Sequence, residues 1–204
     1  MLILGSIPLS YGQVVLSDDL KEVDVIPKLE VFKDSSLLLS FKDVKEGDFF
    51  KPNNGAIYLE YHERAILWLR IIVKNECLEN ETFLLDTRNA TINDIRFFEP
   101  QSDHTYKEFQ TGDAFPYHYR EVETRGFTFT LNIKEGETKV YYVRIDSEGD
   151  AINLPLKIWQ PIEFLNKTAN EKYVFGLYYG SIIFIIIFGM KLKSIIGLVF
   201  IMKL

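Results

Sequence analysis

Residues 127–133 read Phe-Thr-Phe-Thr-Leu-Asn-Ile and alternate between apolar and polar side chains at every position. Successive side chains of a β-strand point to opposite faces, so this pattern is typical of a strand with one face on a core and the other toward water. Residues 139–146 repeat it, with Tyr141, Val143 and Ile145 on one face. The centre of the chain therefore predicts β-structure.

Strand patterns continue on both sides of this centre. Residues 65–74 place Leu67, Leu69 and Ile71 on one face, and residues 154–159 also alternate. Shorter runs predict further strands at 29–33, 56–61, 82–87, 91–98 and 104–109. No helical pattern of ten or more residues separates these strands. We therefore expect an all-β fold, an antiparallel, jelly-roll-like β-sandwich.

The composition narrows the classes of function. Apolar residues make up 47% of the chain and the net charge is −6. Residues 1–170 carry 19 Lys and Arg against 28 Asp and Glu. An acidic domain lacks the basic surface that binds phosphates, so we expect no nucleic-acid partner. The single cysteine, Cys77, excludes an internal disulfide.

The C-terminal part predicts a transmembrane helix. Residues 173–190 contain no charged side chain. As a helix they would be ~27 Å long, close to the ~30 Å of a bilayer's hydrocarbon core. Lys191 and Lys193 follow directly, and the positive-inside rule places such residues in the cytoplasm. The alternative is a buried core element.

The N-terminus resembles the second half of a secretory signal. An apolar run is followed by the small residues Ser10 and Gly12, although a charged n-region is missing. Either the true start lies upstream or the segment is an apolar N-terminal strand. We expect a signal-peptide remnant (1–12), an extracytoplasmic β-sandwich domain (13–162), a linker (163–172), the transmembrane helix (173–190) and a short basic and apolar tail (191–204).

Several aromatic and arginine side chains form the candidate ligand site. Saccharides bind to flat aromatic rings beside planar hydrogen-bonding groups, and arginine offers five donors. The residues expected to line a concave groove on non-core faces are Trp68, Arg70, Tyr119, Arg120, Tyr142, Arg144 and Trp159. The alternative is that the tryptophans pack in a second core layer while the arginines pair with acidic neighbours.

No pattern in the chain indicates catalysis. His62, His104 and His118 are scattered, and acidic residues flank Cys77, which disfavours a thiolate. Glycine loops that cradle phosphates are absent. We expect neither an enzyme nor a bound metal ion or cofactor.

Five groups of residues together resemble one receptor family. In chain order they are Trp68-Leu69-Arg70 with Asn75, Gly112-Asp113 with Pro116 and Arg120, Tyr141-Tyr-Val-Arg144 with Ser147 and Gly149, Leu154-Pro155-Leu156 with Trp159 and Pro161, and Gly176-Leu-Tyr-Tyr-Gly180. Their order and spacing over residues 20–188 resemble the second type of extracellular domain of the seven-transmembrane receptors with diverse intracellular signalling modules.

This resemblance implies a bacterial sensor domain outside the cytoplasmic (inner) membrane that binds a small molecule or carbohydrate. The sequence departs from the family plan after Phe188, where further helices and an output domain would follow, so we expect a receptor truncated before its output. The alternatives are a single-pass anchored binding or adhesion module without signalling and a non-functional receptor fragment. Expected partners are the ligand and the bilayer, with a homodimer left open.

Overall fold

The computed structural model describes residues 12–52 and 55–201. The chain divides into two compact units, of which the first ends at Pro161 and the second begins at Ile162. Each is described by itself. The expected signal-peptide remnant lies, apart from Gly12, outside the described residues.

Within the described residues the larger sheet of the first unit has seven strands. Six follow the order β4-β3-β6-β11-β8-β9, and β1 pairs with β6. The strands are β1 (Val14–Leu16), β3 (Glu30–Asp34), β4 (Lys51–Pro52), β6 (Ile66–Asn75), β8 (Asp94–Pro100), β9 (Tyr106–Thr111) and β11 (Thr138–Asp146). All pairings are antiparallel except that of β1, which runs parallel to β6, so the expected antiparallel arrangement does not hold for this pairing.

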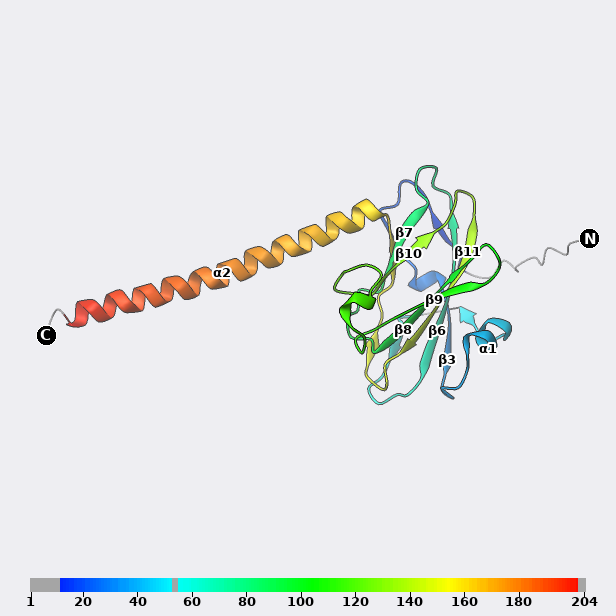
Figure 1. Cartoon of the computed structure of the whole chain (residues 1–204), viewed down its shortest axis with the longest axis horizontal. Helices are drawn as coiled ribbons and strands as arrows, with labels where there is room; N and C mark the ends of the chain where they lie inside the picture. Colours follow the sequence, from blue (N-terminus) through cyan, green and yellow to red (C-terminus); the bar gives the residue numbers. More distant parts are fainter. Residues whose placement is uncertain (1–11, 53–54, 202–204) are drawn as a thin grey trace, which may run out of the picture. The chain divides into compact units, whose positions relative to one another are not determined.

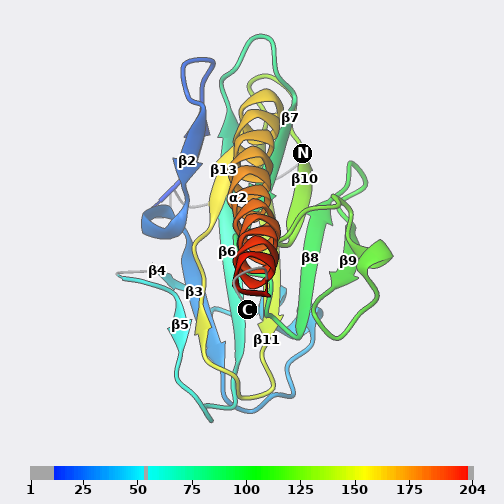
Figure 2. The ribbon, with the colours of Figure 1, turned by 90° about the vertical axis from the view of Figure 1, so that its left-hand side faces the viewer.

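The smaller sheet has the order β10-β7-β13-β2, and Figure 2 shows these strands side by side. They are β10 (Thr128–Asn132), β7 (Thr82–Asp86), β13 (Lys157–Trp159) and β2 (Glu22–Asp24). A two-stranded sheet joins β5 (Tyr58–Leu59) to β12 (Ile152–Asn153). The short helices of this unit are η1 (Ile26–Lys28), α1 (Phe41–Glu46) and η2 (Tyr117–Tyr119).

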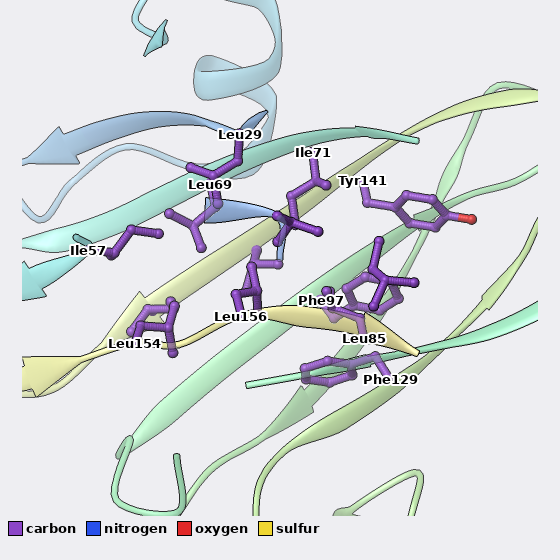
Figure 3. Close-up of a cluster of buried hydrophobic side chains, with 14 of the residues drawn as sticks. Leu29, Ile57, Leu69, Ile71, Leu85, Phe97, Phe129, Tyr141, Leu154 and Leu156 are labelled. Carbon is purple, nitrogen blue, oxygen red and sulfur yellow. The ribbon is translucent and has the colours of Figure 1, made fainter. Parts of the chain in front are cut away.

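The main hydrophobic core combines residues of both sheets. The ring of Phe97 on β8 stacks on that of Phe129 on β10, with centroids 4.8 Å apart. Figure 3 shows these rings with core side chains from several other strands. The two sheets therefore pack face to face, as burying one apolar face of each requires.

The central strand β6 is buried on both faces, which explains its nearly continuous apolar sequence. Leu67, Leu69 and Ile71 belong to the main core. Ile66 and Trp68 belong to a second apolar cluster on the opposite face of the sheet. Figure 1 shows α1 on this second side, away from β7 and β10.

Most predicted strands are present in the structure, although some begin or end at other residues than predicted. Five predicted strands match β3, β6, β7, β10 and β11 to within one residue at each end. The predicted strand 154–159 is wrong in extent, because only 157–159 pair in β13 while Pro155 has no N–H to give. Leu154 and Leu156 still point into the core as predicted. The jelly-roll connectivity stays a prediction.

The described part of the second unit consists of the helix α2 (Pro161–Ile201), whose first residue ends the first unit. It is the helix among the described residues that is long and apolar enough to cross a membrane. The expected linker at 163–172 is helical and continuous with the expected span at 173–190. The large apolar side chains from Tyr173 to Met190 are exposed, which water disfavours and lipid does not.

Candidate functional site

Four of the seven expected site residues share the outer face of the larger sheet, the face turned away from the main core. Cross-strand pairing puts Arg70 of β6 opposite Tyr142 of β11, and Trp68 opposite Arg144. Directly paired residues project from the same face. Alternation along the sequence correctly placed these four on non-core faces, and the pairing of β6 with β11 puts them on the same one.

A segment of the chain covers the aromatic part of this face. We name residues 35–50, between β3 and β4, the strap. Inside it the side chain of Ser40 accepts a hydrogen bond from the backbone N–H of Asp43, whose carboxylate in turn accepts from the backbone of Ser40. This capping box fixes the start of α1. Because β4 pairs back onto β3, the strap is held at both ends.

The strap places an aromatic ring on this face of the sheet. The ring of Phe41 stacks on Phe98, with centroids 4.1 Å apart, and contacts Tyr142 edge-on at 5.3 Å. Beneath it Trp68 is only 1% exposed and Tyr142 5%. Both residues belong to a second core layer. For Trp68 this is the alternative that the sequence raised for the tryptophans.

Arg70 is occupied by an internal ion pair. Its Nε donates to a carboxylate oxygen of Glu30, which is buried on β3, and its guanidinium lies 4.5 Å from the ring centroid of Phe50. Burial alone would lower the pKa of Arg70, but the hydrogen bond and charge of Glu30 outweigh it and raise that pKa. Arg70 therefore remains charged and joins the strap's end to the sheet.

Arg144 belongs to a neighbouring polar network. Its guanidinium donates to Asp94 and Asp146, both at 3.2 Å. Arg96 donates to Asp94 at 3.1 Å and to Glu108 at 3.2 Å. The hydrogen-bonding capacity of these arginines is directed at carboxylates of the same sheet.

The other three expected residues lie elsewhere. Tyr119 and Arg120 are in the loop around η2, where Arg120 donates to the carbonyl oxygens of Thr124 and Arg125. Trp159 follows the core residue Ile158 on β13 and therefore projects from the outer face of the smaller sheet. The structure does not bring the seven side chains into one groove, and their role in ligand binding stays a prediction.

Two hollows lie at opposite ends of β11. The larger, about 520 Å³, is the tip groove, lined by residues of the β8–β9 and β10–β11 hairpins such as Gln101, His104 and Lys139. The smaller, about 340 Å³, is the loop hollow, lined by Tyr61, His62, Arg64, Glu148, Gly149 and Asp150. Both are within the size range of small-ligand sites.

Sequence reasoning missed the loop hollow. From the sequence, Gly149 is noted only as part of a family motif, and His62 only as one of three scattered histidines. The sequence contains one feature that indicates the hollow: Tyr61 and His62 place two adjacent rings among the charged residues Glu60, Glu63 and Arg64. Adjacent aromatic rings in a polar loop are candidates for ligand contact.

The comparisons with known proteins agree with the resemblance found in the motifs. No curated protein matches the chain. The family model described as 7TMR-DISM extracellular 2 matches residues 26–160, most of the β domain. This match confirms the expected family, and the chain therefore belongs to the 7TMR-DISM extracellular 2 family, an extracellular sensory domain family of membrane receptors.

Proposed function

We propose that this chain senses a small polar ligand, of carbohydrate type, outside a bacterial inner membrane. The observation that carries the proposal is the junction at Pro161. The family match ends at Gln160, and the apolar helix α2 begins at the next residue. Residues 161–172, between the domain and the expected span at 173–190, belong to the same continuous helix, so a shift of β13 is passed to the span along α2.

The direction of α2 follows from its flanking charges. The domain precedes the apolar stretch, and Lys191 and Lys193 come directly after it. The positive-inside rule assigns that end to the cytoplasm and the β domain to the other side. Labelling by a membrane-impermeant thiol reagent tests this, with single cysteines introduced at Ser102 and at Lys193 in a Cys77→Ser background. Labelling of intact cells at Ser102 and not at Lys193 is expected, and the reverse pattern would overturn the orientation.

Signalling requires that the ligand prefer one of two states of the protein. The full chain in lipid nanodiscs is the appropriate sample, with neutral saccharides added as probes. A ligand that binds only the folded domain at about 100 times its Kd stabilises it by about 2.7 kcal/mol, which raises the melting temperature. Amide hydrogen exchange then reports on β13 and the first turns of α2.

The two readouts separate two functions. Changed exchange in β13 and at the start of α2 on ligand addition supports sensing. A raised melting temperature with unchanged exchange there would instead indicate an anchored binding module that transmits nothing. If none of the saccharides raises the melting temperature, the proposed ligand class is wrong.

A further inference from the structure

The loop hollow is formed by two loops at one end of the β domain. Residues 60–65 connect β5 to β6, and residues 147–151 connect β11 to β12. Both loops lie toward the bottom of Figure 2. None of the site residues expected from the sequence lines this hollow.

Each loop is fixed on both sides. Leu59 pairs with Ile152 where β5 meets β12, and Ile66 pairs with Asp146 where β6 meets β11. Between these anchors the backbone N–H of His62 donates to the carbonyl of Gly149 at 2.7 Å. The hollow is therefore preformed, which reduces the entropy that ligand binding must overcome.

The donor of this bond, His62, and Glu148, which precedes the acceptor Gly149, both have an unusual backbone. His62 has φ of +70° and Glu148 has φ of +53°, in the left-handed region that side chains disfavour. Such conformations cost roughly 1–3 kcal/mol each and persist where the surroundings enforce them. The loops thus hold their side chains in one arrangement.

The side chains in the hollow retain their hydrogen-bonding capacity. Within the described residues Arg64, Glu148 and Asp150 make no side-chain hydrogen bond or ion pair. In the tip groove, Lys139 donates to the carbonyl of Asn132 and the Asn132 side chain donates to Glu99. The arginines of the outer face are likewise engaged with carboxylates.

An aromatic platform lies beside these groups. Tyr61 is 65% exposed, and its ring centroid is 4.0 Å from that of His62. A pyranose ring presents C–H groups on one face and hydroxyls around its edge. The C–H face suits the Tyr61 ring, while carboxylates accept from hydroxyls and a guanidinium donates to them.

The charge of the hollow selects among polar ligands. Arg64 supplies one positive charge against the two carboxylates of Glu148 and Asp150. This balance disfavours phosphates and other anions. We propose that the loop hollow binds a neutral saccharide, with Tyr61 as the stacking platform. The inference rests on the proposed function, because it locates the ligand site of that sensor.

The test uses the full chain in nanodiscs with maltose, cellobiose and lactose as neutral probes and glucuronate as the anionic control. Calorimetric titration and saturation-transfer NMR measure binding. At least one neutral disaccharide is expected to bind and glucuronate is not. Tyr61→Ala should weaken that binding about tenfold or more, while Tyr61→Phe, which keeps the ring, should retain most of it.

Two control variants test whether the ligand binds in the loop hollow and not elsewhere. Tyr58→Ala removes a tyrosine on β5 that is 61% exposed and outside the hollow, and it should leave affinity unchanged. His104→Ala alters the tip groove and should do the same. All these side chains are on the surface, so each variant is expected to fold with a melting temperature near that of the parent.

The outcomes distinguish this inference from the function on which it rests. Disaccharide binding that survives Tyr61→Ala and Asp150→Ala but is lost in His104→Ala overturns the loop hollow and leaves the sensor function standing. Preferential binding of glucuronate overturns the neutral-ligand assignment. The absence of binding by all three disaccharides overturns both the hollow and the carbohydrate ligand.

Discussion

The ring of Phe41 lies parallel to that of Phe98, with centroids 4.1 Å and planes 7° apart. One ring comes from the strap and the other from the sheet beneath it. Parallel stacking at this distance is the arrangement that a bound ligand ring would adopt on an aromatic platform. The outer face of the larger sheet is therefore occupied by a residue of its own chain.

Phe41→Ala should destabilise the β domain by about 2–3 kcal/mol. The loss is smaller than the ~3–5 kcal/mol of a fully buried phenylalanine, because Phe41 keeps part of its surface exposed. Urea unfolding of the full chain in micelles, followed by tryptophan fluorescence, measures it. Leu38→Ala in the same strap is the control, since Leu38 is 84% exposed and should cost less than about 0.5 kcal/mol. Equal stabilities of the two variants would contradict the packing of the strap.

The ion pair of Arg70 and Glu30 predicts strong coupling between two substitutions. Arg70→Met removes the guanidinium from a carboxylate whose side chain is only 5% exposed, which should cost about 3 kcal/mol. Adding Glu30→Gln removes the buried charge, so the double variant should be more stable than Arg70→Met alone. Urea unfolding of the four proteins gives the coupling energy.

Lys74, on the same strand as Arg70, provides a matched control for the Arg70 substitution. It pairs with Glu76 at 2.6 Å, but both side chains are more than a third exposed. Lys74→Met should therefore change stability by at most about 1 kcal/mol. If Arg70→Met and Lys74→Met cost the same, burial does not set the strength of the Arg70 pair.

The alternation of apolar and polar residues predicted the strands well. It did not predict which segments cover the faces of the sheets. The period of two identified β6, β10 and β11 because each buries at least one continuous face. It also placed Trp68 and Arg70 on the correct face. Which element would cover that face depends on the strap, whose six-residue helix is too short to show a helical period.

The candidate site was less predictable for a related reason. Trp68 and Trp159 look alike in the sequence, since both project from the non-core side of a strand. They are on different sheets, and the strand order that separates the sheets depends on long-range pairing that local patterns do not encode. Tyr61 and Glu148 are brought together by the pairing of β5 with β12 and of β6 with β11, which joins segments far apart in the sequence.

Cys77 should be nearly inert in the folded chain. Burial raises the pKa of its thiol to about 11, and the negative charge of Asp18 adds to the effect. Because an unfolded thiol titrates near 9.0, the folded state favours the neutral thiol. This contribution to stability is complete below pH 9 and is lost as the pH rises from 9 to 11.

Alkylation by iodoacetamide at pH 8 measures this shift. The thiolate fraction in the folded protein should be about a hundredfold lower than in urea, so the reaction should slow at least as much. Asp18→Asn removes the adjacent negative charge and should accelerate alkylation of the folded protein. Equal rates with and without urea would show that Cys77 is neither buried nor shifted.

The exposed apolar surface of α2 predicts how the chain is held in a membrane. Ile185 is near the middle of the uncharged stretch and 67% exposed. A lysine at the centre of a spanning helix costs roughly 2.5–3.5 kcal/mol, so Ile185→Lys should reduce the fraction of the chain that resists alkaline extraction from membranes. Ile162→Lys is the matched control, because Ile162 is also exposed, at 59%, but precedes that stretch. Since Ile162 lies outside the expected span, before the linker, Ile162→Lys should leave membrane retention unchanged. Equal retention of the two variants would mean that residues 173–190 do not span the bilayer.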